Sequence, residues 1–208
     1  MKQKMKDKFS ELEKKLGIAF KKKDFLKEAL THRSYINENP DWGFSQNERL
    51  EYLGDAVLEL VVSEFLFHTY PGYQEGQLTS FRAALVNYQM LAQVAKEISL
   101  EKYIFVSRGE AKDNGRGKEV ILANAIEALF GAVYLDQGYE VVAKLIKKIV
   151  LKHLKKIIAN KLYRDPKSLL QEIVQEKFKV TPTYKVLEEK LPDHQKVFLV
   201  GVLFGEKI

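Results

Sequence analysis

Three acidic side chains stand at the start of a segment that is otherwise almost wholly apolar. Glu48, Glu51 and Asp55 are spaced by three and four residues, and residues 52–67 read YLGDAVLELVVSEFLF, which predicts a core helix. That spacing places the three acids on one face of the helix. A carboxylate inside such a helix is costly unless something pairs with it, and residues 50–81 contain no Lys or Arg. A bound metal ion would supply the missing positive charge.

A second apolar segment repeats the pattern. Residues 121–131 read ILANAIEALFG, with Glu127 inside a predicted helix and Asn124 one turn before it on the same face. Each segment also contains a glycine, Gly54 and Gly131, and an interior glycine costs a helix about 1 kcal/mol relative to alanine. Because glycine permits close approach of two helices, we expect the two segments to cross near these glycines.

Such a crossing would bring together the oxygen atoms of Glu51, Asp55, Asn124 and Glu127. Carboxylate and amide oxygens suit Mg²⁺, for which Mn²⁺ is expected to substitute. A magnesium ion can lower the pKa of a bound water and neutralise charge on a phosphodiester, and paired ions can hold both the attacking and the leaving oxygen. The alternative is an exposed acidic stripe, with Glu127 capping or pairing elsewhere. Two such segments, each with an interior glycine, favour the metal site.

Composition limits the other possibilities. The chain has 208 residues, 46% of them hydrophobic, a net charge of +6 and no cysteine, so disulfides, zinc–thiolate sites and cysteine nucleophiles are excluded. No apolar run reaches the length of a membrane span, and the charged N-terminus lacks a signal-peptide stretch, so we expect a cytoplasmic protein. Nine lysines within residues 2–23 and seven within 144–161 suit a polyanionic substrate, although charge alone equally fits a solvated surface.

Helical periodicity dominates the first 160 residues. We predict that Asp24 caps a second short helix and that Ser45 caps the acidic helix in a capping box with Glu48. Loops are expected at residues 37–43 and 107–118. The remaining predicted helices cover residues 75–98, 120–135 and 139–162, and the acidic helix should end near Tyr70, before Pro71 and Gly72.

The pattern changes after a predicted linker at Tyr163-Arg164-Asp165. A short helix over residues 166–178 precedes two strand-like runs, 183–187 and 196–203, with a turn at Pro192-Asp193-His194 between them. We expect this piece, residues 166–208, to be a domain cut short.

Several motifs together resemble a known family. Residues 48–56, ERLEYLGDA, look like the signature of ribonuclease III, the double-strand-specific endoribonuclease. The resemblance runs from about residue 16 to residue 162 and includes Thr31-His32-Arg33-Ser34-Tyr35, Glu75-Gly76 and the ILAN run with Glu127-Ala128-Leu129. The segment DPKSLLQE at 165–172, with Pro182-Thr183-Tyr184, resembles the start of a double-stranded RNA-binding domain.

The resemblance implies a mostly α fold: an all-helical endonuclease domain over residues 1–162, a linker over 163–165, and the N-terminal part of an α+β RNA-binding domain over 166–208. Asp55 and Glu127 match the catalytic pair of the family, and Glu51 and residue 124 complete its metal ligands. Glu48 and Glu75 match acids that line the catalytic valley of the family. Gln171, Glu172 and His194 match RNA-binding positions of the domain that follows.

Two departures from the family pattern qualify these expectations. Residue 124 is Asn where the family usually has Asp, so the site loses one negative charge and we expect weaker metal binding or slower cleavage. The sequence stops before the third strand and lysine-rich second helix of the family's RNA-binding domain, so we expect weaker RNA binding by this module.

The resemblance implies a homodimeric, Mg²⁺-dependent endoribonuclease that cuts double-stranded RNA, leaves 5′-phosphate and 3′-hydroxyl ends, and processes ribosomal and other structured precursor RNAs. Two alternatives stay open: a duplex-RNA-binding protein that cuts poorly because of Asn124, and a structural helical dimer whose basic faces serve as scaffolding.

Overall fold

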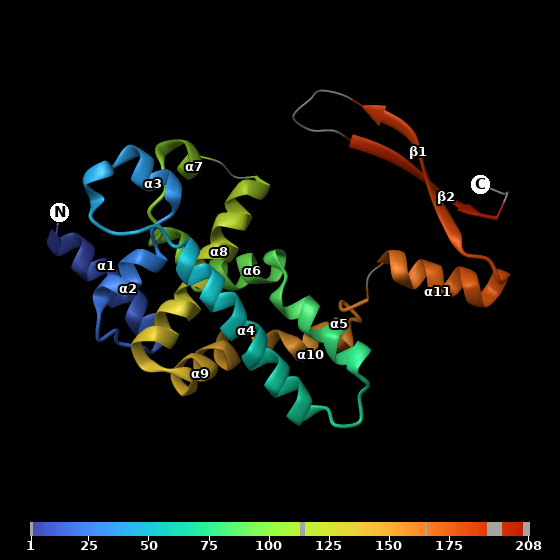
Figure 1. Ribbon diagram of the computed structural model, residues 1–208, viewed down its shortest axis with the longest axis horizontal. Coiled ribbons are helices and arrows are strands. Elements are labelled where there is room, and N and C mark those ends of the chain that lie inside the picture. Colours follow the sequence, from blue (N-terminus) through green and yellow to red (C-terminus); the bar gives the residue numbers. More distant parts are fainter. Residues whose placement is uncertain (1, 113–114, 165, 191–196, 206–208) are drawn as a thin grey trace. The chain divides into compact units, whose positions relative to one another are not determined.

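The computed structural model describes residues 2–112, 115–164, 166–190 and 197–205. The chain divides into two compact units, Met1–Tyr163 and Arg164–Ile208 (Figure 1). The first unit is helical, and the described part of the second contains one helix and a two-stranded sheet. No helix in the part of the chain that the structure describes is both long and apolar enough to cross a membrane.

The first unit contains α-helices joined by short loops and 3₁₀ turns. Its elements are α1 (Lys2–Leu16), α2 (Lys23–Ala29), α3 (Arg33–Glu38), η1 (Pro40–Trp42), α4 (Glu48–Thr69), α5 (Glu75–Val86), α6 (Tyr88–Glu97), η2 (Leu100–Lys102), α7 (Arg108–Lys112), α8 (Arg116–Gln137), α9 (Tyr139–Ile149), η3 (Leu151–His153) and α10 (Leu154–Ala159).

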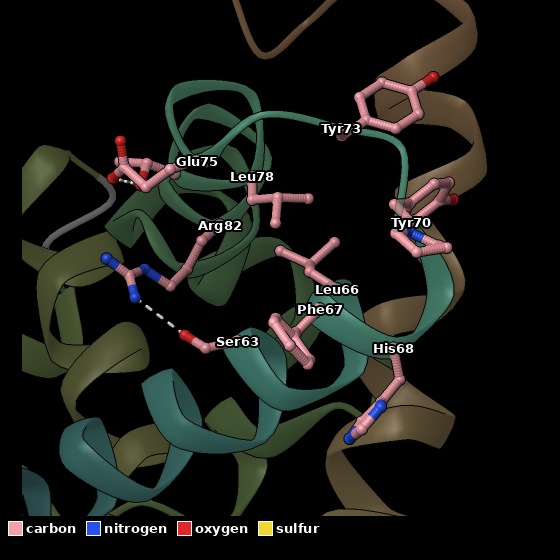
Figure 2. Close-up of a pocket in the computed structure, with 11 residues that line it drawn as sticks. Ser63, Leu66, Phe67, His68, Tyr70, Tyr73, Glu75, Leu78 and Arg82 are labelled. Carbon is pink, nitrogen blue, oxygen red and sulfur yellow. Dashed lines mark hydrogen bonds between the residues drawn. The ribbon is translucent and has the colours of Figure 1, made fainter.

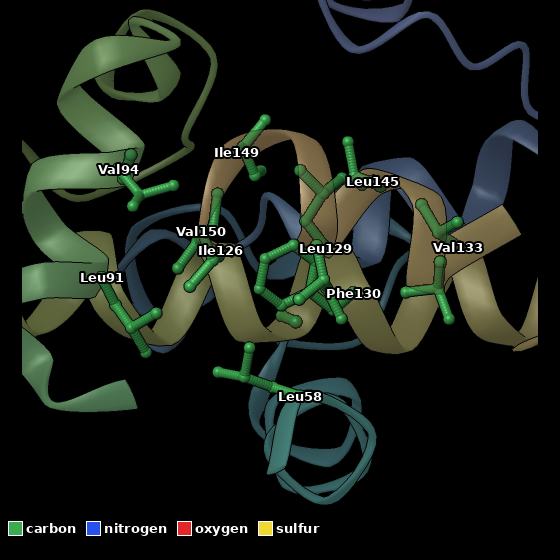
Figure 3. Packing of buried hydrophobic residues seen from close by; sticks show 14 of the residues in the cluster. Leu58, Leu91, Val94, Ile126, Leu129, Phe130, Val133, Leu145, Ile149 and Val150 are labelled. Carbon is green, nitrogen blue, oxygen red and sulfur yellow. The ribbon is translucent and has the colours of Figure 1, made fainter. Parts of the chain in front are cut away.

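Helix α8 lies at the centre of this unit because its sequence is apolar on nearly every side. Helices α2, α4, α6 and α9 all pack against it. Figure 3 shows Leu58 of α4, Leu91 of α6 and Ile149 of α9 approaching Ile126 and Leu129 of α8 from different directions. Full burial of one such side chain contributes about 1.5–3 kcal/mol, so this core is the main stabilising feature of the unit.

Helices α4 and α8 touch through their backbones. A Cβ atom added at Gly54 would lie 1.8 Å from the backbone oxygen of Glu127, and one added at Gly131 would lie 2.3 Å from the backbone oxygen of Leu50. Any larger residue at either position would therefore force the helices apart. The crossing at the two glycines is confirmed.

The start of α4 is fixed by buried polar groups, and the predicted capping box is wrong. Asn47 precedes the helix, and no side chain caps it. The Asn47 side-chain amide instead donates to the Ala29 oxygen (3.4 Å), and its backbone N–H donates to the Thr31 oxygen (2.9 Å). The Trp42 indole N–H donates to the Thr31 hydroxyl (3.1 Å). Long-range bonds to the α2–α3 region, rather than Ser45, thus set where α4 begins.

Other boundaries also differ from expectation. The predicted helix over residues 75–98 is two helices, because Asn87 is extended and its side chain accepts a hydrogen bond from the Met90 backbone N–H, capping α6. The predicted helix over residues 139–162 is interrupted by the 3₁₀ turn η3. Asp24 lies within the first turn of α2, whose N-cap is Lys22.

The two predicted loops are partly helical. The segment at 37–43 contains the end of α3 and the 3₁₀ turn η1, and the segment at 107–118 contains α7 and the first turn of α8. The Ser107 and Arg108 backbone N–H groups donate to the Ser34 hydroxyl (3.0 Å) and the Glu38 carboxylate (3.1 Å). These bonds tie the α7 segment to α3.

The second unit contains α11 (Pro166–Phe178), β1 (Pro182–Lys190) and β2 (Val197–Phe204). The strands are antiparallel, with Pro182 opposite Phe204 and a register shift between Val186 and Glu188. The sheet exposes many apolar side chains. The predicted turn at Pro192-Asp193-His194 lies outside the described residues.

Candidate active site

The acidic residues of α4 and α8 meet where the two helices cross. Glu51 and Asp55 flank Gly54 on α4, while Glu127 belongs to the α8 backbone that Gly54 touches. Glu127 is half-buried, and burial is the largest influence on its pKa, followed by the charges of Asp55 and Glu51. Together they raise the pKa of Glu127 to about 8. The three carboxylates therefore share one electrostatic environment in which a positive charge is missing.

Glu51 belongs to the same cluster. Burial raises its pKa most, and the charges of Glu48 and Asp55 raise it further. A hydrogen bond from the Asn124 side-chain amide acts in the opposite direction and lowers the pKa of Glu51. The structure thus brings together Glu51, Asp55, Asn124 and Glu127, which the sequence had suggested as neighbours, and places Glu48 beside Glu51.

The donors in this cluster suit a divalent cation. All are carboxylate or amide oxygens, the ligands that Mg²⁺ and Mn²⁺ prefer. The raised pKa values indicate carboxylates without enough neutralising charge, which a cation would provide. Within the described ranges, no three His, Cys, Asp or Glu side chains converge closely enough to hold an ion. The residues thus fit the ion by donor chemistry and charge, while the described carboxylates are not already placed as a set of ligands around one point.

Glu48 stands at the rim of the cluster. Its carboxylate lies 3.8 Å from the Arg33 guanidinium and accepts a hydrogen bond from the Gln46 amide (3.0 Å). A cation beside Glu48 was not predicted, since Arg33 comes from a separate helix.

His32 caps α3, because its Nδ1 accepts a hydrogen bond from the Ser34 backbone N–H (3.3 Å). Burial lowers the pKa of His32.

Glu75 occupies a different place. It begins α5, and its carboxylate accepts a hydrogen bond from the Thr79 hydroxyl (2.9 Å). It lines a hollow of about 800 Å³ between the end of α4 and α5, together with Ser63 and Arg82 (Figure 2). Sequence reasoning missed Arg82. The only signal was its position as the first cation after a long stretch without one.

The remaining predicted residues belong to the second unit. Gln171 and Glu172 lie on α11, shortly before the buried Val174, and both are exposed to solvent. His194 lies outside the described residues.

Comparison with known proteins places this geometry in a family. A family model described as ribonuclease-III-like matches residues 22–154. Ribonuclease 3 of a Nitratiruptor species is 47% identical over 197 residues, which cover 95% of this chain and 84% of that protein. Ribonuclease 3 of Borreliella afzelii is 43% identical over 198 residues, which cover 95% of this chain and 80% of that protein.

A solved structure agrees. The nuclease domain of ribonuclease III from Campylobacter jejuni, described as flexible in a region involved in dimer formation, superimposes with a TM-score of 0.62 at 41% identity and covers 68% of this chain and 95% of that one. The acids gathered at the α4–α8 crossing thus lie inside the matched region, and the chain belongs to the ribonuclease III family of endoribonucleases.

Proposed function

We propose that this protein hydrolyses phosphodiester bonds of double-stranded RNA at the α4–α8 crossing. The observation that carries the proposal is the clustering of Glu51, Asp55 and Glu127 around the contact between Gly54 and the α8 backbone. Family membership supplies the substrate class, since ribonuclease III relatives match nearly the whole chain. The site acts, in this proposal, in the cytoplasm.

Glu51, Asp55 and Glu127 are the proposed ligands of Mg²⁺, with Asn124 as a weaker one and Mn²⁺ as a substitute. When bound, the ion lowers the pKa of a water and offsets charge on the phosphodiester. Asp55 and Glu127 are the proposed catalytic pair. The helix crossing holds their backbones in fixed register, so neither side chain depends on a mobile loop for its position. Cleavage would leave 5′-phosphate and 3′-hydroxyl ends.

Duplex RNA would be recognised through its shape, phosphates and 2′-hydroxyls, because side chains cannot read the deep groove of A-form RNA. The proposed substrates are precursors of ribosomal and other structured RNAs, including messenger RNAs. Gln171 and Glu172 on α11, together with His194, are proposed to contact the minor groove. Glu48 and Glu75 are proposed to line the path of the RNA.

A homodimer is proposed to form through α4. The apolar stripe of this helix includes Tyr52 and Leu60, which are eight residues apart and therefore on one face. These side chains are 83% and 57% exposed, although both are large and apolar. An exposed apolar stripe of this kind marks a protein contact. A two-fold dimer would present two cleavage sites to the two antiparallel strands of one duplex.

Asn124 supports a second candidate function, binding of duplex RNA with little cleavage. Its amide carries no charge and occupies the position beside Glu51 where the family pattern has a fourth carboxylate. Weaker attraction for the cation would then leave a protein that binds more than it cuts.

Incubation of the protein with long duplex RNA and Mg²⁺ tests both candidates. The proposed function predicts short products with 5′-phosphates, absent when EDTA replaces Mg²⁺. RNA that stays intact but is retained by the protein, with cutting restored by Asn124→Asp, would favour the second candidate.

A further inference from the structure

The hollow between α4 and α5 has two chemically different ends. Figure 2 shows Arg82 and Ser63 at one end and Tyr70 and Tyr73 at the other, with Leu66 and Leu78 between them. Its volume of about 800 Å³ lies in the range of small-molecule sites. A ligand that fills it would therefore need an anionic end and a flat apolar end.

Arg82 defines the anionic end of the ligand. Its side chain is half-buried, and one guanidinium nitrogen donates to the Ser63 hydroxyl (2.8 Å). Among the described residues no carboxylate lies within ion-pair distance of it. Guanidinium carries five donors in a planar fork that matches phosphate oxygens. A partly desolvated cation with most of its donors unassigned is complementary to a phosphate group.

The aromatic end is rigid. Tyr73 contacts Tyr70 and Phe81 edge-on or tilted, with ring centroids 5.4 Å and 5.5 Å apart, so its orientation is held from two sides. Its side chain is nevertheless 40% exposed. A fixed and partly exposed ring is a surface on which a nucleobase can stack, an interaction that tolerates any base.

We propose that this hollow binds one unpaired nucleotide of the RNA, with its phosphate at the Arg82 guanidinium and its base against Tyr73. The inference rests on the proposed function, because the nucleotide belongs to the RNA that the acidic cluster would cleave. Ser63 follows Asp55 by eight residues of α4, or about 12 Å along the helix axis. A nucleotide in the hollow is thus close to the cleavage site without occupying it.

Glu75 is compatible with this ligand. Its carboxylate lines the hollow and accepts the hydrogen bond from Thr79, which leaves further lone pairs free. These can accept from ribose hydroxyls or from an exocyclic amino group. Glu75 therefore disfavours a bare phosphate ion and favours a ligand that also brings donors, as a nucleotide does.

The first experiment titrates 5′-AMP, and separately adenosine, into ¹⁵N-labelled protein in EDTA, following the arginine side-chain signals. We expect AMP to bind and to shift the Arg82 Nε signal. Arg82→Gln should lose at least the preference for AMP over adenosine, and Tyr73→Ala should weaken both ligands about tenfold. Arg49→Gln is the matched control, since it removes an exposed arginine at the opposite end of α4 from the hollow.

The second experiment compares two duplexes in EDTA, one blunt and one with unpaired 3′ nucleotides, using Glu127→Gln protein. We expect the protein to bind the overhanging duplex more tightly than the blunt one, and Tyr73→Ala should abolish this difference. Because Tyr73 is partly exposed, Tyr73→Ala should fold and so provides a test even if Arg82→Gln does not fold. The sedimentation of each variant is measured in parallel.

The outcomes separate cleanly. Absence of AMP binding overturns the inference. It is also overturned if Arg82→Gln and Tyr73→Ala lose the dimer but bind AMP as the unsubstituted protein does. That result would make the hollow a contact for a second copy of the chain. AMP binding by a protein that never cleaves duplex RNA would leave the nucleotide site standing and reject the proposed nuclease function.

Discussion

Gly54 lies directly against the backbone of Glu127: a Cβ atom at residue 54 would stand 1.8 Å from the Glu127 carbonyl oxygen. One residue thus allows two apolar helices to approach, and the other carries the most perturbed acid of the cluster. The contact between Gly54 and Glu127 therefore fixes both the packing of α4 against α8 and the position of the acid with the raised pKa.

Replacing Gly54 with alanine should destabilise the protein by at least about 3 kcal/mol, because the added methyl group overlaps backbone atoms that cannot rotate away. Urea denaturation measures the difference. Gly76→Ala is the control, since a Cβ atom added there would meet no described atom from another part of the fold within 4 Å. Alanine there should be neutral or stabilise by up to about 1 kcal/mol. Equal effects of the two substitutions would contradict the close crossing.

Glu127→Gln should abolish cleavage of duplex RNA while leaving binding in EDTA within about twofold, because it removes a proposed cation ligand and keeps the side-chain shape. Glu119→Gln is the matched control on the same helix. Glu119 pairs with Lys96 at 2.7 Å on the surface, and loss of such a pair costs about 0.2–1 kcal/mol. Loss of both binding and cleavage in Glu127→Gln would indicate misfolding instead.

The metal-free protein should lose stability as the pH rises from about 4.5 to about 8. Because the folded-state pKa of Glu127, about 8, exceeds the ordinary value of 4.5, the folded state holds more protons in this window, and the free energy of unfolding falls as they leave. The decrease due to Glu127 should be on the order of 2–4 kcal/mol.

Thermal unfolding between pH 5 and pH 9 in EDTA measures this decrease. Glu127→Gln should flatten the dependence, and added Mg²⁺ should do the same in the unsubstituted protein by replacing the proton with a cation. A wild-type curve parallel to that of Glu127→Gln would show that Glu127 titrates normally.

Asn124→Asp should have opposite effects with and without metal. In EDTA it removes the amide donor beside Glu51 and adds a like charge, so we expect a loss of about 1–2 kcal/mol. With Mg²⁺ the added carboxylate should reduce the concentration needed for half-maximal cleavage about tenfold. Mg²⁺ titrations monitored by thermal shift and by cleavage test the two signs. An unchanged Mg²⁺ requirement would separate Asn124 from the ion.

Leu60→Glu should convert the proposed dimer to monomers, because it places a charge within the exposed apolar stripe of α4. Sedimentation velocity measures the change. Leu162→Glu is the control, since Leu162 is as exposed as Leu60 but lies beyond α10. Dissociation by Leu162→Glu alone would move the interface away from α4.

The parts of the fold that were predictable are those that local sequence determines. Long apolar runs predicted helices α4 and α8, and interior glycines predicted where they cross. The gathering of Glu51, Asp55, Asn124 and Glu127 followed from these two facts alone. The helix over residues 166–178 was predicted with its observed bounds because proline opens it.

Elsewhere the deciding interactions are long-range or depend on one residue. The apolar period continues through Asn87, so the break between α5 and α6 has no signature beyond a single capping side chain. Helix α4 begins after Asn47 because Asn47 is hydrogen-bonded to Ala29 and Thr31. These bonds are long-range, so no local sequence pattern predicts them. From the sequence, Arg82 looks like an ordinary arginine on a helix surface. Its half-buried position depends on packing against the end of α4, where it donates to Ser63.

Strand β2 has a practical consequence for anyone who handles this protein. Its sequence, VFLVGVLF, contains no charged residue, and five of its side chains are exposed. Among the described residues its hydrogen-bonded neighbour is β1, and an uncharged strand edge of this kind can pair with the same strand of another molecule. Self-association at high concentration should then begin at β2 of the small unit.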